Sequence, residues 1–365
     1  MNNDKASESF ISKIKRKKKS IYKGRKLNKF KIKRFSSPKA RKYNKIYLIA
    51  IILILIVIST IICYKLEKEF IKYKIIKNTK VCICTPVKKE NRYIKEYVEH
   101  YKKYGVDKIF IYDNNEIDGE RLENVIGDYI KKGFIEVINY RGKITPLMNI
   151  MNNCYQRNYQ IYDWIIFFEV DEHIHLSNYT NVKLYLERDA FKNCEKIHLN
   201  WVHHTDNNLI YYDDRPLYIR FPEVEPNARN NINMSHNSVK TILRGHIPNV
   251  VINYVHKLTH KLKGCDGFGN PKVIHGINTD NSDFRFYYID HYYSKSVEEF
   301  VEKLNKGDVL QGQRAWIKYL RLDNYFKRNN ITFSKLDFIE KRTKLNLMKY
   351  RIRLKQLENK NKKSF

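Results

Sequence analysis

An uninterrupted apolar segment at residues 46–63 constrains this chain more than any other feature. Its 18 residues carry no charge and show no polar face, and as an α-helix they extend roughly 27 Å at about 1.5 Å per residue. That length just spans the hydrocarbon core of a bilayer. A cleaved signal peptide is the competing interpretation, but the basic segment before the run is too long and no small-residue cleavage site follows. The segment therefore predicts a transmembrane helix.

The basic residues are unevenly distributed along the chain. The formal net charge of +31 is compatible with a nucleic-acid partner, but residues 1–45 alone hold 18 Lys or Arg against Asp4 and Glu8. Only six lysines follow the span in residues 64–80, so the positive-inside rule places the N-terminus in the cytoplasm. We expect a single-pass type II membrane protein, in the Golgi if the cell is eukaryotic, and no nucleic-acid partner.

Short strands and helices alternate from residue 81 onward. This alternation predicts an α/β fold in which helices cover both faces of a mostly parallel sheet. Apolar runs indicate strands at 81–87, 108–112, 134–138 and 164–170, and helical periodicity indicates helices at 92–104, 122–132 and 146–159. The pattern is less regular beyond residue 171, with strands expected at 196–201, 217–221, 239–243, 250–254 and 286–289 and helices at 297–304, 314–325 and 336–357.

The six cysteines show no CxxC pair and no Cys/His spacing typical of a metal site. We expect Cys82 and Cys84, on a predicted strand, to face opposite sides and therefore not to pair with each other. We expect the cysteines to be small buried hydrophobic residues rather than disulfides.

The strongest local signal for chemistry is a group of acidic residues that follows the apolar run 164–168. In open α/β sheets, ligands bind at the carboxyl ends of the strands. Strand alternation predicts that Glu169 and Asp171 share one face and that Glu172 lies on the other. Two carboxylates on one face suit a hard cation such as Mg²⁺ or Mn²⁺, which would make a nucleoside diphosphate a workable leaving group. A solvated loop at the strand end is the alternative.

Weaker candidates follow the other predicted strands. Asp113 and Asn114 are placed to contact a nucleotide ribose or base, although Asp and Asn are also common in plain turns. Pro86 and Glu90 come after the first strand and are expected to line the same crevice, although Glu90 equally suits a helix N-terminus. Lys240 offers a cation to a diphosphate, and plain surface charge is the alternative. His291 is a candidate ligand for a divalent metal, although a lone histidine is more often only packed or exposed.

Four segments occur in order along the chain: Glu90–His100 with Gly105 and 109–114, Trp164–Ile174, Ser238–Ile242, and Asp290–Tyr292 with Ser294–Ser296, Glu299–Phe300 and Lys303. Together they resemble glycosyltransferase family 92 and its relatives in the broad family-two-like group. The resemblance covers about residues 81–312 and implies a GT-A fold, a sugar-nucleotide donor and a divalent metal. It also implies Asp171 as a metal ligand, Glu169 at the first acidic position and His291 as a downstream ligand. Glu169 and His173 depart from the family pattern, which has Asp and an aromatic residue there.

The sequence thus predicts a membrane-anchored glycosyltransferase that transfers a sugar from a nucleotide sugar to a glycan or glycoconjugate with inversion, assisted by Mn²⁺ or Mg²⁺. Asp266 is the expected catalytic base, on its downstream position alone. The alternative is a membrane-tethered polybasic protein without enzymatic activity that binds anionic lipid or nucleic acid. The expected parts are a basic tail (1–45), the span (46–63), a stem (64–80), the catalytic domain (81–312) and a basic helical segment (313–365).

Overall fold

The computed structural model describes residues 38–143, 147–225, 238–256, 258–259, 261–273, 286–306 and 315–363. Internal contacts divide the chain into two units, Met1–Glu67 and Lys68–Phe365. Each unit is considered by itself.

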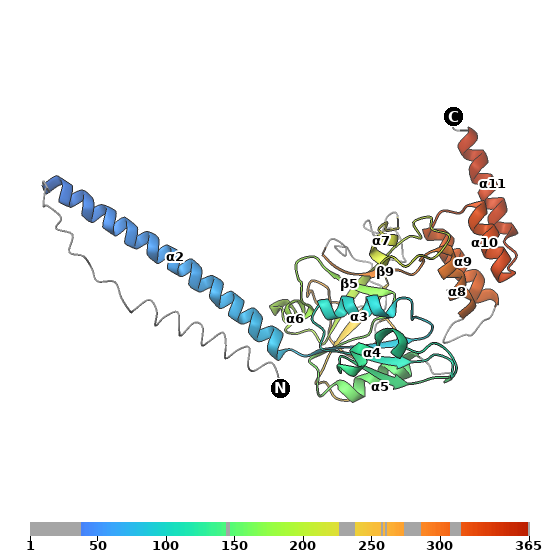
Figure 1. The fold of residues 1–365 in the computed structure, drawn as a ribbon, viewed down its shortest axis with the longest axis horizontal. Helices are drawn as coiled ribbons and strands as arrows, with labels where there is room; N and C mark the ends of the chain where they lie inside the picture. The colour runs from blue at the N-terminus through green and yellow to red at the C-terminus, as the bar shows by residue number, and fades with distance from the viewer. Residues whose placement is uncertain are drawn as a thin grey trace. The chain divides into compact units, whose positions relative to one another are not determined.

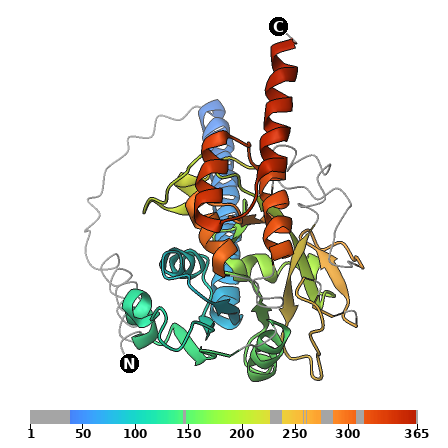
Figure 2. The ribbon, with the colours of Figure 1, turned by 90° about the vertical axis from the view of Figure 1, so that its right-hand side faces the viewer.

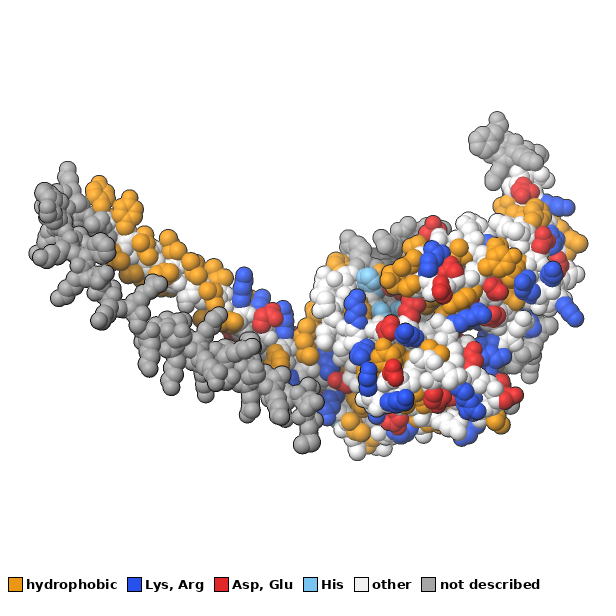
Figure 3. Space-filling model, viewed as in Figure 1, with side chains coloured by type: hydrophobic (Ala, Val, Ile, Leu, Met, Phe, Trp, Pro, Cys, Tyr) orange, Lys and Arg blue, Asp and Glu red, His pale blue; other side chains and the backbone are white. Residues whose placement is uncertain are grey.

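Helix α2 (Pro38–Asn78) contains the apolar segment. Its portion from Lys45 to Asn78 is long and apolar enough to cross a membrane, and none of its most apolar 18-residue window is buried. Figure 3 shows hydrophobic side chains covering much of the described length of this helix. The helix continues past Cys63 to Asn78, so most of the segment predicted as a stem is helical.

The second unit is built on one curled sheet with the strand order β3-β2-β1-β4-β7-β6-β9-β5, and β8 pairs with β6 outside this path. The first four strands in this order are parallel to one another. Strand β7 then runs antiparallel to both β4 and β6. The strands are β1 (Val81–Val87), β2 (Lys108–Asp113), β3 (Ile135–Asn139), β4 (Trp164–Ile166), β5 (Glu172–Leu176), β6 (Lys196–His203), β7 (Val239–Arg244), β8 (Gly264–Asp266) and β9 (Tyr287–His291).

Helices cover both faces of this sheet (Figure 1), and the alternation of side chains along β1 explains how. Val81 and Ile83 join an apolar cluster with α3, whereas Cys82 and Cys84 join a second cluster with α5. The mostly parallel α/β sheet with flanking helices, expected from the sequence, is therefore confirmed. The helices of this region are α3 (Ile94–Lys103), α4 (Glu123–Lys131), α5 (Leu147–Asn158), α6 (Val182–Leu186) and the 3₁₀ turn Asp189–Phe191.

Three predictions for the second half of the chain are wrong, and three elements were missed. Residues 217–221 contain the short helix α7 (Leu217–Arg220) instead of a strand, and the Glu96 carboxylate accepts hydrogen bonds from its first amide. Residues 250–254 form no strand, and β5, β8 and α6 were not expected. The predicted helix 336–357 is two helices, separated where Lys344 adopts a left-handed backbone conformation (φ 57°).

Four helices at the C-terminal end share a third apolar cluster, separate from the two clusters of the sheet. Figure 2 shows the last two, over residues 333–343 and 348–363, in red beside one another. A buried ion pair links this group to the sheet region: Lys335 Nζ lies 2.6 Å from the Asp206 carboxylate, and Tyr325 donates a hydrogen bond to the same carboxylate. The helices are α8 (Val297–Lys306), α9 (Ala315–Arg328), α10 (Phe333–Thr343) and α11 (Met348–Lys363).

Two disulfides correct the expectation that the cysteines are simple buried hydrophobic residues. Cys84 of β1 is bonded to Cys154 of α5, and Cys194 is bonded to Cys265 of β8. Cys82 is free and buried. The expectation that it faces away from Cys84 is wrong, because residues two apart on a strand share one face, and both belong to the cluster with α5. Each disulfide lies within one half of the sheet region.

Candidate active site

A cavity of about 330 Å³ lies where β1, β2 and β4 end, and it brings together most of the predicted site residues. Pro86 comes from the end of β1, Asn114 follows β2, and Glu169 and Asp171 follow β4. Because these neighbouring strands are parallel, their carboxyl ends meet at one edge of the sheet, where ligands of such folds bind. The cavity is also lined by Val87, Lys88, Glu90, Leu147, Ile150, Val170, Val255, His256, Lys303, Lys306 and Arg321.

The Asp171 carboxylate of this cavity lies close to two basic side chains. Its Oδ2 atom lies 2.8 Å from Lys303 Nζ of α8 and 3.8 Å from His291 Nε2 at the end of β9. Burial alone would raise the pKa of Asp171, but Lys303 and His291 hold it well below its ordinary value. Asp171 is therefore an anion at neutral pH, placed between a lysine and a histidine.

The prediction that Glu172 faces away from Glu169 and Asp171 is wrong. It assumed one continuous strand, but β4 ends at Ile166 and the chain turns before β5 begins. Glu172 is fully buried, and its Oε2 atom accepts a hydrogen bond from the backbone amide of Glu169. Lys240 Nζ lies 2.6 Å from Glu169 Oε1 and 3.3 Å from Glu172 Oε1. Burial raises the pKa of Glu172 to about 8 in spite of this lysine. Lys240 therefore joins Glu169, which lines the cavity, to the buried Glu172.

Asp171 and His291 fit a divalent cation. Burial lowers the pKa of His291 well below its ordinary value, so the imidazole is neutral and able to ligate. Metal–ligand bonds to histidine nitrogen and carboxylate oxygen are about 2.1 Å long, so atoms 3.8 Å apart can both contact one ion. No group of three or more His, Cys, Asp or Glu side chains suited to a metal occurs among the described residues, so a cation held by Asp171 and His291 would need further oxygen ligands from a substrate or water.

The remaining predicted binding residues take different positions. Glu90 lines the cavity and is 2.6 Å from Lys306 Nζ. Asp113 is buried beside it without lining it, because its carboxylate accepts hydrogen bonds from Arg141 and from the Asn115 amide groups. Asp113 thus shapes the turn that presents Asn114, and Asn114 itself lines the cavity.

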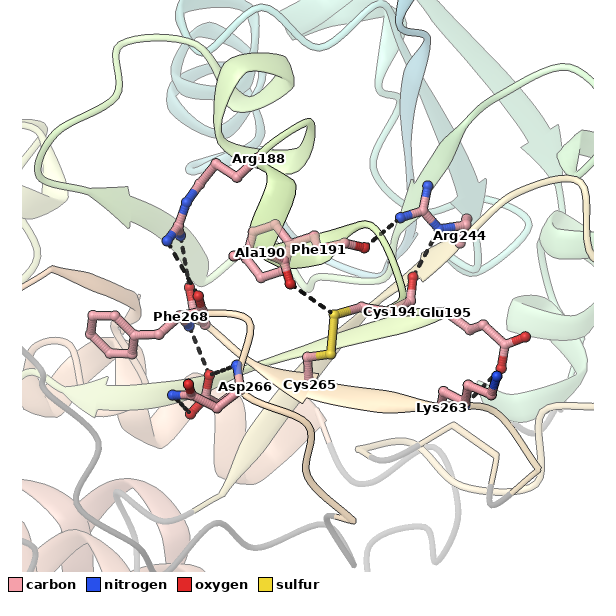
Figure 4. The surroundings of a disulfide bond; sticks show 12 residues. Arg188, Ala190, Phe191, Cys194, Glu195, Arg244, Lys263, Cys265, Asp266 and Phe268 are labelled. Atoms are coloured by element: carbon pink, nitrogen blue, oxygen red, sulfur yellow. Dashed lines mark hydrogen bonds between the residues drawn. A yellow bond between two sulfur atoms is a disulfide. The ribbon is translucent and has the colours of Figure 1, made fainter.

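Asp266, the predicted catalytic base, is the last residue of β8 and lies beside the Cys194–Cys265 disulfide (Figure 4). It pairs with His198 in the first part of β6, and its carboxylate accepts hydrogen bonds from the backbone amides of Phe268 and Asn270 and from the Asn270 side chain. Asp266 lines neither this cavity nor the second cavity that adjoins it. The structure therefore gives it the role of closing the loop that follows the Cys194–Cys265 disulfide.

Three cations of the cavity were not predicted as site residues. Lys303 and Lys306 lie in the last turn of α8, and Arg321 lies in α9. Basic residues are common at helix C-termini, where they complement the helix dipole, so their position gave no signal of a site. Only the fold brings them opposite Glu90 and Asp171.

A second cavity, of about 390 Å³, adjoins the first and shares Glu90, Lys303 and Lys306 with it. The loop after β1 and the segment from Tyr293 through α8 form its walls. Its other lining residues are Lys89, Arg92, Tyr93, Glu120, Tyr293, Ser294, Lys295, Glu299, Glu302 and Asn305.

The sequence matches a family model described as Glycosyltransferase family 92 over residues 77–345. This range begins before and ends after the predicted catalytic domain 81–312. A glycosyltransferase family 92 protein of Ricinus communis is 32% identical over 117 residues, which are 31% of this chain and 19% of that protein. One of Oryza sativa subsp. japonica is 27% identical over 99 residues, or 26% and 16%. The matched segments thus span less than a fifth of these curated relatives.

Solved structures that are similar include S. aureus TarS 1–349 in complex with UDP-GlcNAc. It has 12% sequence identity and a TM-score of 0.33, with 72% of this chain and 79% of that chain covered. The same TarS fragment in complex with UDP has 12% identity and a TM-score of 0.32, with 68% and 71% covered.

Proposed function

The chain belongs to glycosyltransferase family 92, and from that premise we propose that it transfers a sugar from a nucleotide-sugar donor to a hydroxyl of a glycan or glycoconjugate. The observation that carries this proposal is the cavity at the ends of β1, β2 and β4, which joins Asn114, Glu169 and Asp171 with cations from α8 and α9. Its volume of about 330 Å³ lies at the low end of the range of small-molecule sites.

The charged residues of this cavity suit a diphosphate leaving group. Asp171 and His291 would hold a divalent cation, Mn²⁺ or Mg²⁺, which supplies a Lewis acid to the phosphate oxygens. Lys303, Lys306 and Arg321 line the same cavity and offset negative charge that develops as the sugar bond breaks. Asn114, at the end of β2, is placed to orient the nucleoside.

Glu90 replaces Asp266 as the proposed catalytic base. Of the described carboxylates that line the two adjoining cavities, Glu90 alone lines both. A base at this junction can accept the proton of an acceptor hydroxyl while the donor occupies the other cavity. Direct attack of that hydroxyl on the anomeric carbon would invert its configuration.

We also propose that helix α2 anchors the enzyme in a membrane with the catalytic unit on the non-cytoplasmic side. The apolar window of α2 and the positive charge before it support this topology. The two disulfides add support, because disulfides persist in oxidising compartments and are rare in the cytosol.

The test is thermal unfolding of the full chain in detergent with UDP or GDP, with and without Mn²⁺. We expect a nucleoside diphosphate to raise Tm only when Mn²⁺ is present, and Asp171→Asn to abolish that increase. Asp128→Asn in α4 is the matched control, which removes the same charge elsewhere and should keep the response. A chain that binds anionic vesicles or RNA but gives no response to any nucleotide would support the polybasic alternative and contradict the proposal.

A further inference from the structure

The second cavity is separate from the one assigned to the donor, and it contains a buried lysine without a close carboxylate partner. It lies between the loop that carries Lys89 and the segment from Tyr293 through α8, and it opens beside the donor cavity at Glu90. Both its volume of about 390 Å³ and its mixed lining suit a second small ligand or the end of a larger one.

Lys295 is the buried cation of this cavity. Its side chain is 8% exposed, and its Nζ atom lies 3.6 Å from the centre of the Tyr93 ring. The nearest carboxylate is Glu90 at 4.0 Å, and within the described residues the Nζ atom makes no hydrogen bond. An ammonium removed from water is costly unless it is hydrogen-bonded and paired. Lys295 is thus a buried charge that is only partly compensated.

The glutamates of the cavity do not supply the missing partner, because each has its own. Glu90 is 2.6 Å from Lys306, and Glu302 is 2.8 Å from Arg92. The other two are likewise occupied: Glu299 is 2.8 Å from Arg220 and accepts hydrogen bonds from Ser296 and Tyr93, and Glu120 accepts the Asn91 amide.

The backbone indicates that the position of Lys295 is imposed by the fold. Lys295 has φ 50° and Lys89, on the opposite wall, has φ 52°. For residues other than glycine this left-handed conformation costs about 1–2 kcal/mol, and such strain clusters at ligand sites. Both strained residues are lysines that line the same cavity, and within the described residues Lys89 forms no ion pair.

We propose that this cavity binds the acceptor and that Lys295, assisted by Lys89, recognises an anionic group on it, a phosphate or a carboxylate. The inference rests on the proposed function, since it assigns the neighbouring cavity to the donor. Ammonium groups bind phosphate and carboxylate oxygens with strong charge-assisted hydrogen bonds. The acceptor is therefore an acidic glycan or glycoconjugate, and its reacting hydroxyl is directed to Glu90 at the junction.

Binding of small acidic sugars to the full chain in detergent tests this inference. The protein is saturated with UDP and Mn²⁺ so that the donor cavity is filled, and glucose 6-phosphate, glucuronate and glucose are titrated by calorimetry. We expect one or both acidic sugars to bind and glucose to bind at least about tenfold more weakly. The first two probes distinguish a phosphate from a carboxylate.

Substitutions locate the binding. Lys295→Gln should weaken the acidic sugar about tenfold or more, Lys89→Gln should weaken it less, and Lys295→Arg should restore most of it. Lys355→Gln on the exposed part of α11 removes one charge elsewhere and should change nothing. If Lys295→Gln lowers Tm strongly, Lys89→Gln and Lys295→Arg still carry the test, because both keep the buried cation.

Three results would overturn the inference: equal binding of glucose and the acidic sugars, no weakening by Lys295→Gln and Lys89→Gln, or a Lys295→Gln protein that loses UDP while keeping the acidic sugar. Failure of the wild-type protein to bind UDP would instead contradict the proposed function. The same titration without UDP then decides whether the second cavity binds an acid.

Discussion

The two halves of the catalytic sheet are built in different ways. From β1 to β4, each strand is joined to the next by a local helix, and all four strands are parallel. From β5 onward, neighbours in the sheet are far apart in sequence, and three of the pairings are antiparallel. The first half supplies Pro86, Glu90 and Asn114, Asp171 follows its last strand, and the second half supplies Lys303, Lys306 and Arg321.

This difference indicates that the two halves of the sheet have different roles. The first half forms an apolar frame beside the first cavity, and the second half places cations against it. These cations are held by ion pairs, Lys303 with Asp171 and Lys306 with Glu90, rather than by local sequence periodicity. Substitutions matched between the halves can therefore separate chemistry from framework.

The largest expected effect is on catalysis. Asp171→Ala should lower donor turnover at least about a thousandfold, which corresponds to about 4 kcal/mol of activation free energy, because it removes the carboxylate that would bind the cation. Asn114→Ala in the first half should lower turnover much less and act mainly on KM. Steady-state kinetics with Mn²⁺ measures both.

A melting curve is the control for these variants. Asp171→Ala should lower Tm, because it leaves the partly buried Lys303 without its carboxylate partner at 2.8 Å, so turnover is compared below both melting transitions. Glu172→Ala should lower Tm as well, because it leaves Lys240 without one of its buried partners. Equal turnover in the wild type and Asp171→Ala would refute the different roles given to the two halves.

The next effect is on stability. Asp206→Ala removes the partner of Lys335, and the exposed fractions of these two side chains are only 2% and 1%. Breaking a buried pair by removing one partner typically costs about 3–5 kcal/mol. The matched change in the first half, Glu136→Gln, loosens the more exposed pair with Lys108 and should cost less than about 1 kcal/mol. Urea unfolding would disprove the prediction if the two costs were equal.

Loss of a disulfide should have a smaller effect on stability, but its effect on UDP binding distinguishes the two halves. They close loops of nearly equal length, with sequence separations of 70 and 71, so loss of either by double Cys→Ser substitution should cost a similar amount, about 2–4 kcal/mol. Only the pair Cys84–Cys154 fixes α5, whose Leu147 and Ile150 line the donor cavity. Its loss should therefore weaken UDP binding as well, whereas loss of Cys194–Cys265 should not. The reverse result would contradict the assignment of the cavity.

The smallest effect is on the pH dependence of stability. Burial, with Lys196 nearby, lowers the pKa of His198 to about 3. The unfolded chain, with a histidine pKa near 6.5, then binds one more proton between these values, so stability falls as pH falls below about 6.5. His198→Gln should reduce this slope by up to about 1.4 kcal/mol per pH unit between pH 6 and 5. Urea unfolding at several pH values measures it, and an unchanged slope would contradict a neutral buried imidazole.

The sequence predicts the first half of the sheet well and the second half less well, for physical reasons. The runs 81–87 and 108–112 are apolar, flanked by helical periodicity, and both form strands as expected. Strand β5, in contrast, contains Glu172, His173 and His175, and polar residues do not indicate a strand. It forms because β9 pairs with it across more than a hundred residues of sequence, which no local pattern records.

The same limit applies to the site. Pro86, Glu90, Asn114, Glu169 and Asp171 were found because they follow predicted strands, and all five line the donor cavity. Distance along the chain could not place Asp266, which lies on a strand beside the early part of β6. Lys303 and Lys306 reach the cavity only because α8 packs across the strand ends.

The order of the cysteines along the chain has a consequence for biosynthesis. Cys84 pairs with Cys154 and Cys194 pairs with Cys265, so the two disulfides follow one another without crossing. If the catalytic unit is translocated as proposed, its residues emerge in chain order, and the first bond can form before Cys194 emerges. Oxidation would then keep pace with translocation, and correct pairing would need no later exchange between the two bonds.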